Sequence, residues 1–244
     1  MHANSRPVSS NQISMHDQLG ELVARHAQSH FQKPIADVNR QAFTYAIDAW
    51  CAAGKPTLIL DAGCGVGLST WHLAQQNPGS FVVGVDQSAD RLARHTAWSG
   101  PPPLNCVLVR ADLVDFWRLL LEAGIHPARH YLLYPNPWPK KSQLARRWHG
   151  HAIFPAIIAL GGAIECRSNW KIYIEEFAAA LQQLTSQPVV CESYQVAGPA
   201  DTDPKLPKPM TPFEEKYRAS GHALWRCRVQ LPTHISGCET PLVS

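Results

Sequence analysis

The stretch TLILDAGCGVG, residues 57–67, decides the fold of this chain of 244 residues. Its first half is a continuous apolar run closed by an acid, which is typical of a strand buried on both faces of a parallel sheet. Gly63, Gly65 and Gly67 follow at once, and a helix is predicted over residues 68–76. A strand, a glycine turn and a helix in this order form the first unit of a nucleotide-binding α/β sheet.

The spacing of the glycines indicates what kind of ligand the turn accepts. It reads G-x-G-x-G, with Leu68 at the position where the dinucleotide fingerprint has its last glycine. Such a loop lets a ligand press against the backbone, but it suits a pyrophosphate less well. A tight turn without a ligand is the alternative interpretation.

Acids also close the next two predicted strands. The second strand ends in Asp86, whose carboxylate can accept hydrogen bonds from both hydroxyls of a ribose. Its alternative role is the N-cap of a helix over residues 89–98, and we favour the ribose because the glycine loop precedes it. The third strand, residues 105–110, leads to Asp112, which either accepts from an adenine amino group or caps a helix over residues 116–122.

The fourth strand, residues 131–134, runs into the proline-rich sequence YPNPWPKK, residues 134–141. Its three prolines fix φ and extend their predecessors, so the loop is stiff and holds Asn136 and Trp138 in one short arc. Trp138 either stacks on a base or seals the end of the sheet. Between residues 123 and 164 there is no Asp or Glu, which indicates a polyanionic partner, although a solvated basic face is the other interpretation. The cations of the arc are Lys140, Lys141, Arg146 and Arg147.

Composition narrows the class of protein. The formal net charge is only +3, and the seven cysteines form no C-x-x-C pair, so they are expected to be reduced thiols of a cytoplasmic protein. No clustered spacing of metal ligands is present, and we expect no metal. The N-terminus has no apolar signal segment, and the longest apolar run, residues 152–164, is broken by Pro155 and two glycines, so no membrane span is expected.

The alternation of strands and helices predicts an α/β fold, a Rossmann-like sheet of seven mostly parallel strands with helices on both faces. We expect an N-terminal arm over residues 1–38, a single domain over residues 39–232 and a disordered tail over residues 233–244. The remaining predicted elements are helices over residues 39–53, 143–160 with a kink at Pro155, and 169–184, and strands over residues 163–166, 189–196 and 223–231.

Residues 58–229 resemble the tRNA (guanine-N7-)-methyltransferase family. The glycine loop alone is generic to enzymes that use S-adenosylmethionine (SAM), and the more specific motifs lie later in the chain. These motifs are YPNPWPKK, the pair Arg146-Arg147, SNW at residues 168–170 followed by Tyr173, T-P-F-E at residues 211–214, and Gly221-His222. The resemblance implies a class I SAM-dependent methyltransferase that transfers a methyl group to N7 of a guanine in a folded tRNA loop.

The resemblance also implies roles for individual residues. The expected SAM-binding residues are Asp61, Gly63, Gly65, Gly67, Asp86 and Asp112. Asn136 is the expected catalytic residue, and the expected residues toward the guanine and its RNA are Trp138, Lys140, Lys141, Arg146, Arg147, Asn169, Thr211 and Glu214. The expected partner is tRNA or another structured RNA.

Two positions depart from the family, because its P-D-P-W and T-D acids are here the amides Asn136 and Asn169. Guanine N7 is already a lone-pair nucleophile, so its methylation requires alignment and no obligatory base. Recognition changes more, because a carboxylate can accept from both N1–H and N2–H₂ of guanine, whereas an amide has one acceptor and two donors. A mispaired edge typically costs about 1–3 kcal/mol. The departures therefore bear on the preference for guanine more than on the use of SAM.

Two further interpretations stay open. Amino-group methyltransferases carry N-P-P-[YFW] after the fourth strand, and Asn136-Pro137-Trp138 is similar to that motif with one proline missing. A catalytically silent SAM-binding or RNA-binding paralogue would also combine intact cofactor motifs with an altered substrate shell. The C-terminal motifs favour the tRNA family.

Overall fold

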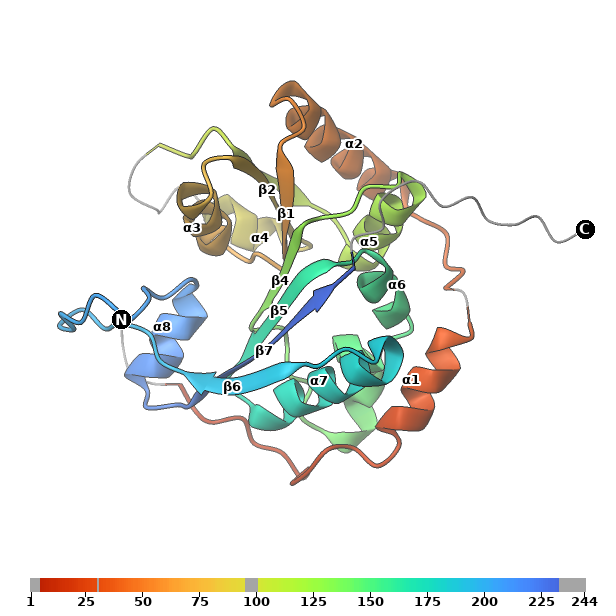
Figure 1. Ribbon diagram of the computed structural model, residues 1–244, viewed down its shortest axis with the longest axis vertical. Coiled ribbons are helices and arrows are strands. Elements are labelled where there is room, and N and C mark those ends of the chain that lie inside the picture. The colour runs from red at the N-terminus through yellow and green to blue at the C-terminus, as the bar shows by residue number, and fades with distance from the viewer. Residues whose placement is uncertain (1–4, 30, 95–100, 233–244) are drawn as a thin grey trace, which may run out of the picture.

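The computed structural model describes residues 5–29, 31–94 and 101–232, and Figure 1 shows their arrangement around one central sheet. The sheet has seven strands in the order β3-β2-β1-β4-β5-β7-β6. Strand β7 is antiparallel to its neighbours β5 and β6, and the other neighbouring strands are parallel, so the predicted α/β fold is confirmed. The strands are β1 (Thr57–Ala62), β2 (Ser80–Asp86), β3 (Cys106–Arg110), β4 (Arg129–Leu133), β5 (Gly162–Ser168), β6 (Val190–Tyr194) and β7 (Leu224–Leu231).

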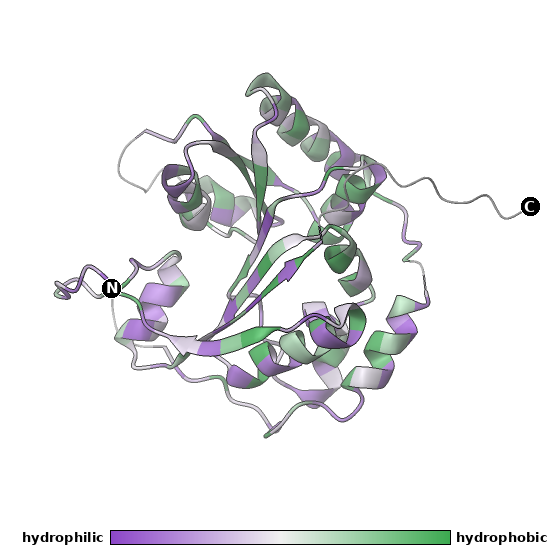
Figure 2. Ribbon diagram, in the orientation of Figure 1, coloured by the Kyte–Doolittle hydropathy of each residue, from purple (hydrophilic) through white to green (hydrophobic). Residues whose placement is uncertain are grey.

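Helices cover both faces of the sheet. The α-helices are α1 (Leu19–Ala27), α2 (Asp37–Ala52), α3 (Leu68–Gln76), α4 (Ala89–Leu92), α5 (Leu113–Glu122), α6 (Phe154–Ala159), α7 (Lys171–Thr185) and α8 (Pro212–Ala219), and the 3₁₀ helices are η2 (Lys141–Arg146) and η3 (Trp148–Gly150). Neighbouring side chains of a strand point to opposite faces. Leu58 and Leu60 therefore join the larger apolar cluster beneath α2, α5, α6 and α7, whereas Ile59 packs with Leu73 of α3 and Met210 on the other face. Hydrophobic residues recur along the strands and the helices that cover them (Figure 2).

The predicted helix over residues 143–160 is wrong. The chain there forms η2, η3 and the short helix α6, and Pro155 lies at the start of α6, where a proline is tolerated, so it kinks nothing. Gly150 packs so tightly that a Cβ on it would lie 2.3 Å from the carbonyl oxygen of Leu144. The chain thus turns back on itself between Leu144 and Gly150, where the pattern predicts a continuous helix.

Residues 5–18 form an irregular segment that belongs to no sheet and runs along the lower edge of Figure 1. We call this segment the arm strand. The Ser5 N–H donates to Oγ of Ser220, and Oγ of Ser10 donates to the carbonyl of Pro139 at 2.5 Å. Helix α1, which follows the arm strand, packs on α7. The N-terminal part of the chain thus lies against the loop that follows β4.

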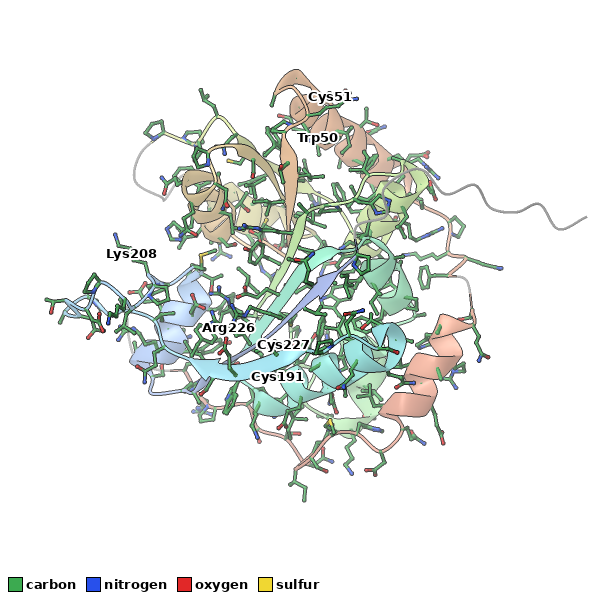
Figure 3. All side chains as sticks on the ribbon, in the orientation of Figure 1. Trp50, Cys51, Cys191, Lys208, Arg226 and Cys227 are labelled. Atoms are coloured by element: carbon green, nitrogen blue, oxygen red, sulfur yellow. The ribbon has the colours of Figure 1, made fainter. Side chains whose placement is uncertain are left out.

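The described cysteines are free thiols. Cys166, Cys227 and Cys191 lie in one row across β5, β7 and β6, and Figure 3 labels the last two. Among the described residues, no helix is both long and apolar enough to cross a membrane. The expected disordered tail, residues 233–244, and the last part of the expected helix over residues 89–98 lie outside the described residues.

Candidate functional site

A cavity of about 780 Å³ lies over the carboxyl ends of β1, β2 and β4. In an open α/β sheet, ligands bind at this edge, beside the point where the strand order reverses. Here the order reverses between β1 and β4. The lining residues that the sequence predicts as site residues are Gly63, Gly65, Asp86, Asp112, Asn136, Trp138, Arg146, Asn169 and Thr211.

The glycine loop between β1 and α3 forms the floor of one half of the cavity. Gly63 and Gly65 have φ angles of +80° and +60°, which side chains rarely allow. The N–H of Gly65 donates to Oδ2 of Asp86 at 3.0 Å. Gly67 has a φ of +81°, and a Cβ on it would lie 2.6 Å from the side chain of Leu108, so a larger residue would strain the backbone and displace that side chain. The loop is thereby tied to the end of β2, and its backbone faces the cavity.

Asp86 is held in place by backbone donors. Besides Gly65, the N–H of Ser88 donates to its Oδ1 at 2.8 Å, and Nη1 of Arg91 lies 3.5 Å from Oδ2. The N-cap of α4 is Ser88, whose Oγ accepts from the N–H of Arg91, so the alternative that Asp86 caps this helix is wrong. A carboxylate that lines the cavity and offers only acceptors suits the hydroxyls of a ribose.

Asp112 does cap its helix. Its Oδ1 accepts from the N–H of Val114 at 2.8 Å, and its own N–H donates to Oδ1 of Asn39 at 3.0 Å. The cap interpretation is therefore confirmed, with α5 starting at Leu113. Since Asp112 also lines the cavity, its contact with an adenine amino group stays a prediction.

Asp61, at the end of β1, is fully buried behind the glycine loop. Its Oδ2 accepts from the hydroxyls of Ser69 at 2.6 Å and Thr70 at 2.7 Å. Its Oδ1 has no hydrogen-bond partner among the described residues. Burial raises the pKa of Asp61 to about 6, although the two hydroxyls lower it and the charge of Asp86 raises it further. Asp61 is not among the residues that line the cavity, so its contact with a cationic group of a ligand stays a prediction, supported by this buried oxygen without a partner.

The loop after β4 is strained where it meets the cavity. Tyr134 and Trp138 have φ angles of +55° and +43°, which cost free energy for residues with a side chain. Between them Asn136 is exposed, and its Oδ1 lies 3.5 Å from the N–H of Trp138. The guanidinium of Arg146 lies over the ring of Trp138, 4.8 Å from its centroid. An amide, an indole and one of the four predicted cations therefore share the cavity wall.

Arg147 does not lie on this wall. It is fully buried, and its guanidinium donates to Glu176 at 2.5 Å and to Gln12 at 3.0 Å. Its Nε donates to the carbonyl of Trp138 at 3.1 Å. The expectation that Arg147 meets phosphates is thus corrected, because a cation sealed against a buried carboxylate cannot reach them. It ties the proline loop to the arm strand and to α7.

Lys140 and Lys141 are exposed and lie outside the cavity lining. Lys141 lines a smaller hollow of about 360 Å³ between α1 and η2, together with His16 and Arg25. Their contact with phosphates stays a prediction for the surface around the cavity.

In the T-P-F-E motif of residues 211–214, the first residue lines the cavity and the last is buried in the core. Thr211 lines the cavity and caps α8, because its Oγ1 accepts from the N–H of Glu214 at 3.0 Å. Glu214 is fully buried, and its carboxylate accepts from Arg167 at 2.9 Å and from the Met210 N–H at 2.5 Å. The expectation that Glu214 faces a guanine is therefore corrected. Glu214 stabilises the start of α8 through its bond from the Met210 N–H.

Sequence reasoning missed several residues of the wall. Tyr134 lines the cavity, and its hydroxyl donates to Oε1 of Glu214 at 3.1 Å. Burial raises the pKa of Tyr134 far above its usual value, so the phenol stays protonated. Its place between an apolar strand and the first proline was the available signal. The other missed residues of the lining include Arg91, Arg94, His151, Phe213 and Tyr217.

Comparison with known proteins agrees with this geometry. A family model described as "Putative methyltransferase" matches residues 55–227. The tRNA (guanine-N(7)-)-methyltransferase of Acidovorax sp. (strain JS42) is 26% identical over 188 residues, 73% of this chain and 70% of that protein. The protein of the same name from Mycobacterium avium (strain 104) is 28% identical over 204 residues, 78% of this chain and 72% of that protein. A solved structure of an "Antibiotic Related Methyltransferase" shares the fold, with a TM-score of 0.51 and 15% identity over 84% of this chain and 98% of that one.

Proposed function

This chain belongs to the methyltransferase family whose model it matches, and from that premise we propose that it methylates N7 of a guanine in tRNA. SAM is the methyl donor. The observation that carries the proposal is the single cavity that joins the glycine loop and Asp86 to Asn136 and Asn169. Donor and acceptor sites in one hollow allow the two reacting atoms to be aligned, which is the main requirement of a methyl transfer.

The residues of the first half of the cavity fit SAM. The backbone of Gly63 and Gly65 allows close approach, Asp86 offers acceptors to a ribose, and the buried Oδ1 of Asp61 offers a negative charge to an ammonium group. When bound, SAM supplies a methyl group on a positively charged sulfur. We assign the adenine amino group to Asp112, which lines the cavity beside the end of β3.

The methyl transfer that we assign to the half of the cavity around Asn136 requires no base. The lone pair of guanine N7 forms the new bond to the methyl carbon as the bond between that carbon and sulfur breaks. The product base carries the positive charge that the sulfur loses, and no proton has to leave. An amide at Asn136 is therefore compatible with the chemical step, and its role is to position the base. This is why the loss of the family's acid does not argue against the reaction.

The partner follows from the surface around the cavity. Arg146 stacks on Trp138 at the wall, and Lys140 and Lys141 are exposed beside it, which suits the phosphates of a structured RNA. Trp138 adds an aromatic face to a site that must receive an unstacked base. We place the enzyme in the cytoplasm, with residues 39–232 as the methyltransferase domain and residues 1–38 as its arm.

The test is incubation of the purified protein with labelled SAM and bulk tRNA, followed by nucleoside analysis. N7-methylguanosine is the expected product, and a variant with Asp86→Ala is the matched control for loss of the cofactor site. Label in a methylated amino group of adenosine or cytidine would instead support the amino-group interpretation of Asn136. Binding of SAM without transfer to any RNA would identify a silent paralogue.

A further inference from the structure

A chain of hydrogen bonds connects the arm strand to the cavity. Asn169, at the end of β5, lines the cavity, and its Nδ2 lies 3.1 Å from Nδ1 of His222. The other ring nitrogen of His222, Nε2, lies 3.1 Å from the carbonyl oxygen of Ser5. The backbone of the arm strand, a histidine and a cavity amide are thus linked in series.

Each partner in this series restricts the next. A carbonyl oxygen can only accept, so Nε2 of His222 must carry a proton toward Ser5. In a neutral imidazole the other nitrogen then has a lone pair and no hydrogen. Nδ1 can therefore pair only with a donor, and Asn169 has to turn its NH₂ group toward it. The orientation of the amide follows from the Ser5 carbonyl, independently of which end of the amide is assigned as nitrogen.

The surroundings hold His222 in the geometry that this requires. Its ring stacks on Tyr217 with centroids 5.4 Å apart and an angle of 13° between planes. The backbone N–H of His222 donates to the carbonyl of Tyr217 at 3.0 Å, which fixes the turn after α8 as well. The N–H of Ser5 donates to Ser220 Oγ at 3.1 Å, which anchors the acceptor on the same turn. The imidazole of His222 and the carbonyl of Ser5 are therefore both held by this turn.

We propose that the Ser5 carbonyl, acting through His222, orients Asn169 so that its Oδ1 is the atom presented to the target base. Resting on the proposed function, we assign this oxygen to the N1–H and N2–H₂ edge of guanine. An amide that flipped freely would offer donors as often as an acceptor, and the guanine edge needs an acceptor. The fixed orientation restores one of the acceptors that the family's carboxylate supplies. His222 is a positioning residue in this account.

The orientation is tested without any activity. In protein with ¹⁵N-labelled histidine, the two nitrogen shifts of neutral His222, measured in mildly alkaline buffer, report which one carries the proton. The expected result is a proton on Nε2. Loss of the signal in His222→Phe assigns it, and His222→Gln serves if that variant does not fold. A proton on Nδ1 would overturn the proposal, because Asn169 would then have to present its oxygen to the ring and its NH₂ to the cavity.

Discrimination between bases tests the consequence. Inosine lacks the N2 amino group, so an RNA with inosine at the target position should be methylated with a kcat/KM roughly 5- to 150-fold below that of the guanine RNA. His222→Phe keeps the aromatic stacking but frees the amide, and it should reduce this ratio toward 1. Adding Asn169→Asp to His222→Phe should restore the ratio, because the two oxygens of a carboxylate are equivalent and need no orientation. SAM affinity, measured alongside, should stay constant.

The outcomes separate the two claims. Failure of the wild type to form N7-methylguanosine would refute the proposed function and the assignment to guanine, while the nitrogen shifts would still decide the orientation of the amide. Formation of N7-methylguanosine with an unchanged inosine ratio in His222→Phe would refute the inference alone. A double variant that discriminates no better than His222→Phe would also contradict it.

Discussion

Two consecutive arginines with opposite surroundings offer a sharp test of the structure. Arg147→Met removes a guanidinium that donates to Glu176 at 2.5 Å, Gln12 at 3.0 Å and the Trp138 carbonyl at 3.1 Å. Both charged groups of the pair are fully buried. Breaking a buried pair by removing one partner typically costs about 3–5 kcal/mol. The free energy of unfolding should fall by that amount, which is a large share of the stability of a typical domain, about 5–15 kcal/mol.

The assay is urea unfolding followed by circular dichroism, at a temperature where the wild type and the variant are both folded. Arg146→Met is the matched control, because that side chain is exposed, and its stability should stay within about 0.5 kcal/mol of the wild type. Adding Glu176→Gln to Arg147→Met removes the buried carboxylate charge that has lost its arginine and should recover part of the loss. Equal free energies of unfolding for the two arginine variants would refute the assignment of Arg147 to the core.

Other predictions follow from the same structure. Burial would raise the pKa of Glu176, but hydrogen bonds and charges of His149 and Arg147 lower it to about 2. The stabilisation by this carboxylate is therefore present above about pH 4.5 and is lost as the pH falls toward 2. Acid titration of the free energy of unfolding should show a loss of about 3 kcal/mol from this group, absent in Glu176→Gln. Burial raises the pKa of Asp61 to about 6, so the affinity for SAM, measured by calorimetry, should weaken up to about tenfold per pH unit below that value, and Asp61→Asn should abolish the dependence. Arg146→Met should flatten the log–log salt dependence of RNA binding by roughly 0.7–0.9, and a wild-type slope would remove Arg146 from the phosphate contacts. Asn136→Asp together with Asn169→Asp should raise N7-methylguanosine formation on tRNA, and a fall measured by nucleoside mass spectrometry would contradict our account of the guanine edge.

Local patterns predicted the half of the cavity to which we assign the cofactor. The apolar run before Asp61 and the glycines after it require a buried strand and a tight turn wherever the rest of the chain lies. The predicted helix over residues 68–76 matches α3, and the acid of Asp86 lies in the cavity as expected. These features depend on interactions between residues close in the sequence, which is why the sequence alone could specify them.

The residues that were misplaced depend on distant partners. Arg147 and its neighbour Arg146 are chemically identical, but Arg147 is buried against Glu176, 29 residues later, and Gln12, 135 residues earlier. Glu214 is buried because Arg167 lies 47 residues earlier on β5. Where a helix over residues 143–160 is predicted, the chain forms η2, η3 and α6, and Arg147 between η2 and η3 is buried against the distant Glu176. A charge pattern along one segment cannot show which charges will find a partner elsewhere.

The arm strand has a consequence for the order in which the enzyme is completed. Ser5 leaves the ribosome before its partner Ser220, which is made 215 residues later, and before His222, which follows Ser220. Contacts across so many residues form late, because they require closure of a long loop. The half of the cavity around the glycine loop can therefore assemble earlier, whereas the contacts that we propose to orient the amide of Asn169 must wait for the synthesis of Ser220 and His222. A substitution that displaces Ser5 would therefore act on this last step and, through the proposed orientation of Asn169, on the choice of base.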